Sequence, residues 1–225
     1  MSGNFVQRGE PALIDKWKRA EMAILNGVDL VIELPTFYAL SSAEFFAKGS
    51  ISILDSISVI DNIFFGSECG NISYLEKIAK TLTLESFDLQ SKIKENLKSG
   101  MTFAKARELS LKDILKDDSL EEVLSSSNNI LGIEYIKSLI NLNSSILPIT
   151  LKREGSRYND KSLTSTFASA TSIRENLKKD LSLGELEKYL PSASLDILYS
   201  LKEINYPFIF CLLYTSPSPR DVEES

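Results

Sequence analysis

One stretch decides the fold class: Val59-Ile60-Asp61-Asn62-Ile63-Phe64-Phe65, followed directly by Gly66-Ser67-Glu68. A largely apolar run that ends in a small polar turn is typical of a strand buried on both faces. A second run of this kind, Val28–Leu34, ends at Pro35. Amphipathic helices are predicted over 41–58 and from about Ile72 onward. Strand, helix, strand and helix with short connections predict an α/β protein with a parallel sheet.

Outside this unit the predicted elements are mostly helical. Helices are expected over Pro11–Asn26, where Gly27 ends the helix, and over Asn128–Leu142, before a strand over Ser145–Leu151. The segment 81–127 is charged and helical in period, which indicates a helical insertion. Short helices are predicted over 172–179 and 183–190. We therefore expect the following parts in chain order: an α/β core over 1–80, the insertion over 81–127, the rest of the core over 128–180, a helical region over 181–210 and a tail over 211–225.

The tail is Pro- and Ser-rich and differs from everything before it. It is similar to the translated sequencing adapters found on some assembled genes, and the alternative is a native disordered tail. We expect it to contribute nothing to the fold.

Composition narrows the classes of function. The net charge of −6 argues against a general nucleic-acid coat, DNA included, although a local basic patch can still bind a phosphate backbone. No apolar run is long enough to span a membrane, and the polar N-terminus is unlike a signal peptide. With only Cys69 and Cys211, the chain fits a reducing compartment, so we expect a cytoplasmic protein. The lack of histidine excludes Ser-His-Asp catalysis and His-ligated metals, and we predict no metal site.

Polar groups gather where predicted strands end and helices begin. Gly66 would let a nucleotide lie against the backbone at the carboxyl end of a strand, and the alternative is a plain turn. Arg153 and Glu154 follow the strand over Ser145–Leu151, where a solvated turn is the alternative. Asn128 precedes an apolar helix, and a helix cap would also explain it. These positions favour an α/β nucleotide-binding domain over a structural protein.

Two further segments carry groups suited to anions. The run 169–174 places hydroxyls and an arginine at a helix start, which suits phosphate; the candidates are Ser169, Thr171, Ser172 and Arg174, and a capped helix with a surface arginine is the alternative. The polar opening loop and the helix after it offer amide, backbone and cationic donors near its glycines. Its candidate substrate-binding residues are Ser2, Gly3, Asn4, Gln7, Arg8, Lys16, Lys18 and Arg19, although a charged helix face would equally explain the last three.

Taken in order, these motifs resemble the bacterial tRNA(Met) cytidine acetate ligases over about residues 1–205. Besides the opening loop, the resemblance rests on the runs 16–23, 27–35, 42–47 and 65–68, and on Asn128-Asn129-Ile130-Leu131-Gly132, Lys152-Arg153-Glu154-Gly155 and Ser169-Ala170-Thr171-Ser172-Ile173-Arg174. It implies a Rossmann-like nucleotidyltransferase core that binds ATP at Gly66, Asn128 and Arg153, with Glu154 beside them. It also implies phosphate binding by 169–174.

The same resemblance implies a reaction and partners. Such ligases use ATP, with Mg²⁺, and acetate to form acetyl-adenylate, and then acetylate the wobble cytidine of elongator tRNA(Met). The family's first strand and its His-x-Gly-His loop would precede Met1, so we expect these 225 residues alone to bind ATP weakly, if at all, and to be inactive. Two alternatives stay open: another adenylyltransferase of the same superfamily, and a nucleotide- or RNA-binding module without catalysis.

Overall fold

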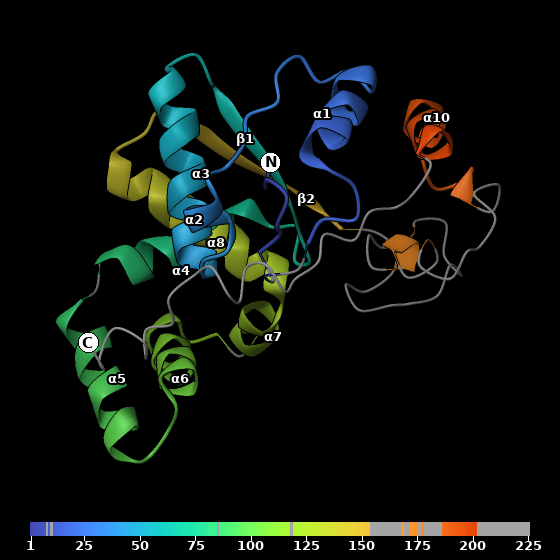
Figure 1. Ribbon diagram of the computed structural model, residues 1–225. Helices are drawn as coiled ribbons and strands as arrows, with labels where there is room; N and C mark the ends of the chain where they lie inside the picture. The colour runs from blue at the N-terminus through green and yellow to red at the C-terminus, as the bar shows by residue number, and fades with distance from the viewer. Residues whose placement is uncertain are drawn as a thin grey trace, which may run out of the picture. The chain divides into compact units, whose positions relative to one another are not determined.

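The computed structural model describes residues 1–7, 9, 11–84, 86–117, 119–153, 168, 172–174, 177 and 186–201 (Figure 1). The chain forms two compact units. Unit 1 comprises Met1–Leu40 and Gly155–Ser225, and unit 2 comprises Ser41–Glu154. The boundaries expected from the sequence at 80, 127, 180 and 210 stay predictions.

Unit 2 contains a parallel pair of strands, β1 (Asn62–Ser67) and β2 (Leu147–Lys152). The register runs from Asn62 opposite Leu147 to Ser67 opposite Lys152. The predicted α/β class with a parallel sheet is therefore confirmed. Burial on both faces is wrong for β1, because burial alternates along the strand and Phe64 is 62% exposed. Among the described residues the sheet has only two strands, and nothing covers this side chain.

Three helices of unit 2 pack with the sheet: α3 (Ala43–Ile57), α4 (Ile72–Leu84) and α8 (Ser127–Leu142), as Figure 1 shows. All three agree closely with the helices predicted there. Apolar side chains from α3, β1 and α8 form one core cluster, and a larger cluster lies between α4 and α8. Gly132 lets α8 approach β1, because a Cβ at this position would collide with the ring of Phe65. The carboxyl end of β1 and the N-terminal turn of α8 are thereby held close together.

The segment predicted as an insertion is helical, as expected, and forms three further helices of unit 2. They are α5 (Phe87–Lys98), α6 (Phe103–Leu115) and α7 (Leu120–Ser125). Hydroxyl caps start the first two, since Ser86 accepts from the Leu89 N–H and Thr102 from the Lys105 N–H. Leu89, Leu111, Leu120 and Val123 join the α4–α8 core, so the insertion is packed onto unit 2.

Unit 1 contains α1 (Lys16–Leu25), α2 (Thr36–Ala39) and α10 (Ser192–Ser200). The helix predicted from Pro11 begins at Lys16 instead, because the Asp15 carboxylate caps it by accepting from the N–H groups of Trp17 and Lys18. Gly27, at φ +98°, follows the helix as predicted. The Asn26 amide donates to the hydroxyl of Ser194 at 3.0 Å and so joins α1 to α10.

The buried strand predicted over Val28–Leu34 is wrong. This segment is irregular and makes one isolated parallel bridge, between Leu34 and Ser2, and Leu30 is 66% exposed. Its pairing in the described residues is limited to the chain start, where Met1 donates to the Ile32 carbonyl and the Leu34 N–H donates to the Met1 carbonyl. An apolar run without a neighbouring strand cannot form the ladder that its composition favours.

No helix in the described residues is long and apolar enough to cross a lipid bilayer. Residues 172–174 are helical, as predicted, and the rest of the short helix expected there lies largely outside the described residues. The helix expected over 183–190 is not seen as such, because the described part, 186–190, forms turns. The tail expected from 211 onward also lies outside the described residues.

Candidate functional site

Gly66 and Arg153 lie side by side at the carboxyl edge of the sheet. The strands are parallel, so both end at this edge, and the Arg153 N–H extends the ladder by donating to the Ser67 carbonyl at 2.9 Å. A Cβ built on Gly66 would lie 3.1 Å from Cγ of Arg153, so the aliphatic stem of the arginine covers the glycine. This juxtaposition of two predicted ATP-binding residues is what the sequence pattern anticipated.

Glu68 clamps the start of α8. Its Oε1 accepts from the Asn128 side-chain nitrogen at 2.7 Å and from the Asn128 N–H at 3.3 Å, while its Oε2 accepts from the Asn129 N–H at 2.9 Å. The carboxylate thus satisfies free N–H groups at a helix start and faces the positive end of the helix dipole. The helix-cap alternative for Asn128 is wrong, because Asn128 lies in the first turn of the helix and the carboxylate of Glu68 takes the capping role. ATP binding by Asn128 stays a prediction.

Asn129, at the start of α8, bonds in turn to the backbone of the turn that carries Glu68. Its Oδ1 accepts from the N–H groups of Glu68 and Cys69, at 2.9 and 3.1 Å, and its Nδ2 donates to the Val123 carbonyl at 3.2 Å. The side chain is only 2% exposed, so these bonds are shielded from water. Glu68 and Asn129 were not among the predicted ligands, although Asn129 directly follows Asn128 and Glu68 follows Gly66 by two residues. Their signal was a carboxylate directly after a Gly-Ser turn and a doubled asparagine.

The clamp fixes the polarity of the Asn128 side chain. A carboxylate only accepts hydrogen bonds, so the atom of Asn128 that meets Glu68 must be the amide nitrogen. Its carbonyl oxygen is then directed elsewhere, with no hydrogen bond within the described residues. At this edge of the sheet, Asn128 therefore offers an acceptor to a ligand.

The turn after β1 is equally constrained. The buried Ser67 hydroxyl accepts from the Gly70 N–H at 3.0 Å and contacts the Thr150 hydroxyl at 2.8 Å. Gly70 has φ +62°, and a Cβ there would clash with Lys152, including its Cα at 3.0 Å. Backbone and buried hydroxyls therefore set the position of the Gly66–Glu68 turn before any ligand arrives.

The Arg153 side chain is exposed and makes no ion pair or hydrogen bond with any residue that the structure describes. The N–H donors of an arginine that stabilises a fold usually bond to other groups of the protein, whereas those of Arg153 lie exposed at the end of a strand. Glu154, predicted beside it, lies outside the described residues.

The predicted cations of unit 1 are used differently. Arg19 donates to three backbone carbonyls, those of Ile14 and Ser2 at 3.0 Å each and that of Gly3. Burial lowers the pKa of its guanidinium from the ordinary value, against the opposing effects of Asp15 and Glu33. Arg19 thereby fastens two of the predicted opening-loop residues to α1.

The two lysines of α1 are also paired. Lys16 forms an ion pair with Glu33 at 2.7 Å, and the Asn4 side chain accepts from the Lys16 N–H at 3.2 Å. Lys18 pairs with Glu21 at 2.8 Å, and that hydrogen bond raises the pKa of the lysine. Gln7 is exposed, and Arg8 lies outside the described residues.

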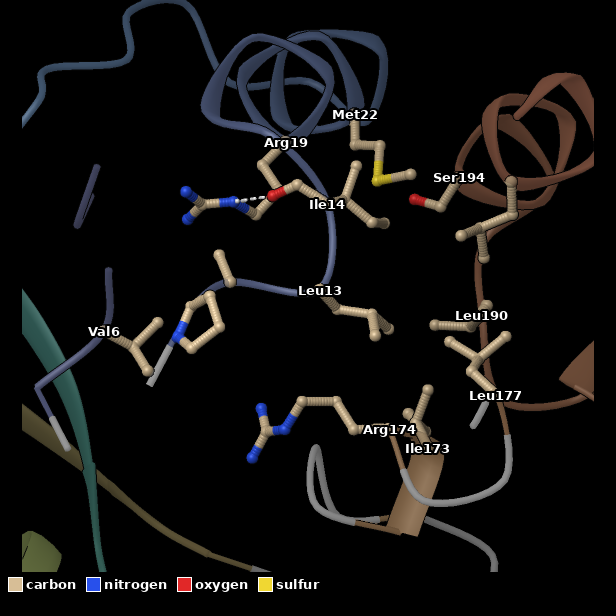
Figure 2. Close-up of a pocket in the computed structure, with 13 residues that line it drawn as sticks. Val6, Leu13, Ile14, Arg19, Met22, Ile173, Arg174, Leu177, Leu190 and Ser194 are labelled. Atoms are coloured by element: carbon tan, nitrogen blue, oxygen red, sulfur yellow. Dashed lines mark hydrogen bonds between the residues drawn. The ribbon is translucent and has the colours of Figure 1, made fainter. Parts of the chain in front are cut away.

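Arg19 and Arg174 line a common pocket of unit 1, with a volume of about 420 Å³. Its other walls are mainly apolar and include Leu13, Ile173 and Leu177. Figure 2 shows the two guanidinium groups extending to the same side of the pocket, away from Leu177 and Leu190. Ser172 is fully buried, and Ser169 and Thr171 lie outside the described residues. The structure therefore brings one predicted phosphate ligand, Arg174, together with one predicted opening-site cation.

Comparison with known proteins identifies the family. The family model described as HIGH Nucleotidyl Transferase matches residues 1–216. The chain belongs to the HIGH nucleotidyl transferase family. In this family, the tRNA(Met) cytidine acetate ligase of Thermoanaerobacter sp. (strain X514) is 53% identical over 200 residues, which cover 89% of this chain and 50% of that protein. The ligase of Clostridium botulinum (strain Okra / Type B1) is 54% identical over 196 residues, covering 85% and 48%.

Two solved structures of one relative also match this chain over most of its length. The crystal structure of Thermotoga maritima TmcAL in its apo form I matches with a TM-score of 0.82 and 41% identity, covering 88% of this chain and 48% of that one. Its form II, bound with alpha-thio ATP, matches with a TM-score of 0.79 and 40% identity, covering 88% and 47%. The resemblance inferred from the motifs is confirmed, and the chain spans about half the length of the relatives it matches.

Proposed function

We propose that the protein is an ATP-dependent tRNA(Met) cytidine acetate ligase and that the β1–β2 edge of unit 2 is its nucleotide-binding face. The observation that carries this proposal is that Gly66, the aliphatic stem of Arg153 and the contact between Asn128 and Glu68 all lie at the constrained turn after β1. The Arg153 guanidinium has no partner among the residues that the structure describes. The alpha-thio ATP bound by the Thermotoga maritima relative supports ATP as the ligand.

The orientation of the Asn128 amide indicates which part of ATP its oxygen can contact. Since its nitrogen is bound to Glu68, its oxygen can accept from a nucleotide donor but cannot bind a phosphate oxygen. The donors of ATP are the adenine amino group and the ribose hydroxyls, so the Asn128 oxygen is assigned to the nucleoside part, while the second N–H of the same amide stays available to an acceptor. Arg153 carries the positive charge of this edge and suits a phosphate group.

The proposed reaction has two steps. An oxygen of acetate attacks the α-phosphorus of ATP, the bond to the pyrophosphate oxygen breaks, and acetyl-adenylate and pyrophosphate form. The N4 amino group of the wobble cytidine then attacks the acetyl carbonyl carbon, AMP leaves, and the amino group loses a proton. The first step needs no general base, because acetate is already a nucleophile, and it gains most from positioning and from cations.

We include Mg²⁺ in this proposal as a companion of ATP only. The described residues contain no group of three or more carboxylate or thiol side chains that could hold a metal ion. Both oxygens of Glu68 at this edge are already used by α8. The residues that the structure describes therefore do not form a magnesium site on the protein, and the cation would enter with the phosphates of ATP.

The remaining parts of the proposal concern partners and place. Acetate and elongator tRNA(Met) are the proposed substrates, and the cytoplasm is the proposed compartment. Ser172 and Arg174, with Ser169 and Thr171, stay predicted phosphate ligands. Lys16, Lys18 and Arg19 stay predicted tRNA contacts, although each already has a partner within unit 1.

A chimera tests the proposed function directly. The segment of the Thermoanaerobacter relative that matches this chain is replaced by the chain's own residues, and transfer of labelled acetate to elongator tRNA(Met) is measured. We expect transfer that requires ATP and releases one AMP and one pyrophosphate per acetyl group. A folded chimera that binds ATP but acetylates nothing would point to the alternative of another adenylyltransferase.

A further inference from the structure

We propose that a cavity among the helices of unit 2 receives an unpaired nucleotide of an RNA strand, with the base against its apolar wall and the phosphate at its cationic rim. The proposal deepens the proposed function, because it supplies a contact for the RNA substrate outside the β1–β2 edge. The cavity has a volume of about 520 Å³ and lies among α3, α4, α5, α6 and α8.

One wall of the cavity is apolar and regular. Leu89, Ile93 and Leu97 recur every fourth residue of α5 and therefore share one face of that helix. Phe103, the first residue of α6, lines the same cavity and is 61% exposed. An exposed aromatic ring beside an aliphatic wall suits stacking of a flat base, and every base has such a face.

The rim of the cavity is cationic. Lys94, Arg107 and Lys137 line it, against one lining carboxylate, Glu44. With Glu134, which pairs with Arg107 and Lys137, the group still carries one excess positive charge, in a chain whose net charge is −6. A phosphodiester group supplies the negative charge that such a rim attracts.

A buried carboxylate holds two of these cations in place. Glu134 is 5% exposed; Lys137 donates to its Oε2 at 2.7 Å, and Nη2 of Arg107 lies 3.5 Å from its Oε1. One negative charge thus anchors two positive ones. Arg107 makes this ion pair but no hydrogen bond with any residue that the structure describes, so its planar set of N–H donors remains available to an anion.

The location fits a long substrate. Lys137 follows Asn128 by nine residues along α8, or about 13 Å at 1.5 Å per residue. At 3.6 residues per turn the two side chains lie on opposite faces of α8, so an RNA strand that presents one nucleotide near the β1–β2 edge must pass around the helix to place another at this cavity within unit 2. A partner protein helix fits less well, because the apolar wall carries both a cationic rim and a single exposed ring rather than a continuous apolar stripe.

The chain supplies matched variants for a test. Phe103 and Phe87 are each the first residue of a helix after a hydroxyl cap, at 61% and 83% exposure, but only Phe103 lines the cavity. Lys94 and Lys98 are both exposed on α5, but only Lys94 lines it. Binding of a fluorescent single-stranded oligouridylate and of the anticodon stem-loop of elongator tRNA(Met) to the 225-residue chain is measured by anisotropy at several salt concentrations. Melting temperatures are recorded alongside.

We expect Phe103→Ala to weaken binding of both RNAs at least fivefold, since a stacked base is lost. Lys94→Gln should weaken it less and lower the salt slope by about 0.7 for one phosphate contact on a single strand. Phe87→Ala and Lys98→Gln should change affinity less than twofold, and all four variants should melt like the wild type.

Several results would overturn the inference. One is no binding of either RNA, and another is an equal loss in the cavity and control variants. A third is binding of free AMP that depends on Phe103 while RNA binding does not, which would assign the cavity to a free nucleotide. Capture of a peptide with the same dependence on Phe103, without RNA binding, would assign it to a protein. Acetate transfer by the chimera is independent of these outcomes, so failure of the RNA cavity and failure of the ligase assignment are separable.

Discussion

The β1–β2 edge of unit 2 and the opening segment of unit 1 both carry residues predicted to bind substrate, but they use their charges in opposite ways. At the edge, the buried Asn129 and the carboxylate of Glu68 satisfy the backbone N–H groups, while the exposed Arg153 side chain and the Asn128 oxygen have no hydrogen bond to any described residue. In the opening segment, Arg19 donates to backbone carbonyls of unit 1 and Lys16 forms an ion pair with Glu33. A cationic side chain close to a glycine-rich loop can therefore either bind substrate or act as a fastening, by which we mean a side chain that ties backbone segments together, as Arg19 does.

The largest expected loss of stability comes from breaking the hydrogen bonds of Asn129, which hold the β1–β2 edge against α8. Asn129→Ala removes the acceptor for two backbone N–H groups and the donor to the Val123 carbonyl, all in a region shielded from water. We expect a loss of about 3 kcal/mol in the free energy of unfolding, at 1–3 kcal/mol for each buried group left unpaired. The melting temperature should fall by roughly 10 °C.

Asn128→Ala is the matched control for that change. It removes one hydrogen bond to Glu68 at a half-buried position and should cost about 1 kcal/mol. Denaturant unfolding of the two variants compares them directly. Equal losses would show that the buried half of the clamp does not carry the stability of this edge.

The next effect tests the fastening in unit 1. Arg19→Lys keeps the charge but cannot reach the carbonyls of Ile14, Ser2 and Gly3 together. We expect the free energy of local opening to fall by about 2 kcal/mol. This should appear as faster hydrogen exchange at the Leu34 N–H, which donates to the Met1 carbonyl.

Lys18→Gln serves as the control for Arg19, because its partner Glu21 is exposed on the same helix and surface pairs contribute little. Exchange at Leu34 should be unchanged in this variant. If Arg19→Lys leaves exchange unaltered but weakens tRNA binding, Arg19 is the RNA contact expected from its position in the sequence.

These two regions also show what the sequence could predict. The parallel strands, α3, α4, α8 and the helices between α4 and α8 follow from periodicity and turn residues, and the proximity of Gly66 to Arg153 follows from strand polarity. The buried strand over Val28–Leu34 was predicted on composition, which cannot tell whether a neighbouring strand is present to pair with it. Glu68 and Asn129 were missed as site residues because their roles depend on contacts across about sixty residues of chain: the Gly-Ser-Glu turn and the doubled asparagine mark the positions, but a local pattern does not show that the two meet.

A smaller effect on stability should accompany a change in nucleotide selectivity. Glu68→Gln keeps the shape of the clamp but removes its charge at the start of α8, at a cost of about 1 kcal/mol. A glutamine can donate as well as accept, so the Asn128 amide is no longer held in one orientation. In the chimera we expect poorer discrimination between ATP and its analogue without the adenine amino group, or between ATP and 2′-deoxy-ATP.

Competition binding with the two analogues separates these donors. Whichever analogue loses its penalty in Glu68→Gln identifies the group that Asn128 contacts. Unchanged discrimination against both analogues, with the expected loss of stability, would leave the clamp as structural and remove Asn128 from the nucleotide site.

The smallest effect on stability, and the sharpest contrast with Arg19, is expected at Arg153. Its side chain is exposed and unpaired among the described residues, so Arg153→Gln should leave the melting temperature within about 2 °C of the wild type, as is usual for surface changes. Glutamine keeps part of the stem that covers Gly66 but loses the charge. In the chimera, ATP affinity should fall about tenfold or more, because a charge-assisted hydrogen bond of 1.5–3 kcal/mol is lost. Lys152→Gln, the exposed cation one residue earlier, should leave ATP affinity within twofold when both are measured by calorimetry. If the two variants lose equal affinity, the edge attracts ATP through general charge, and the contrast between a ligand arginine and a fastening arginine does not hold.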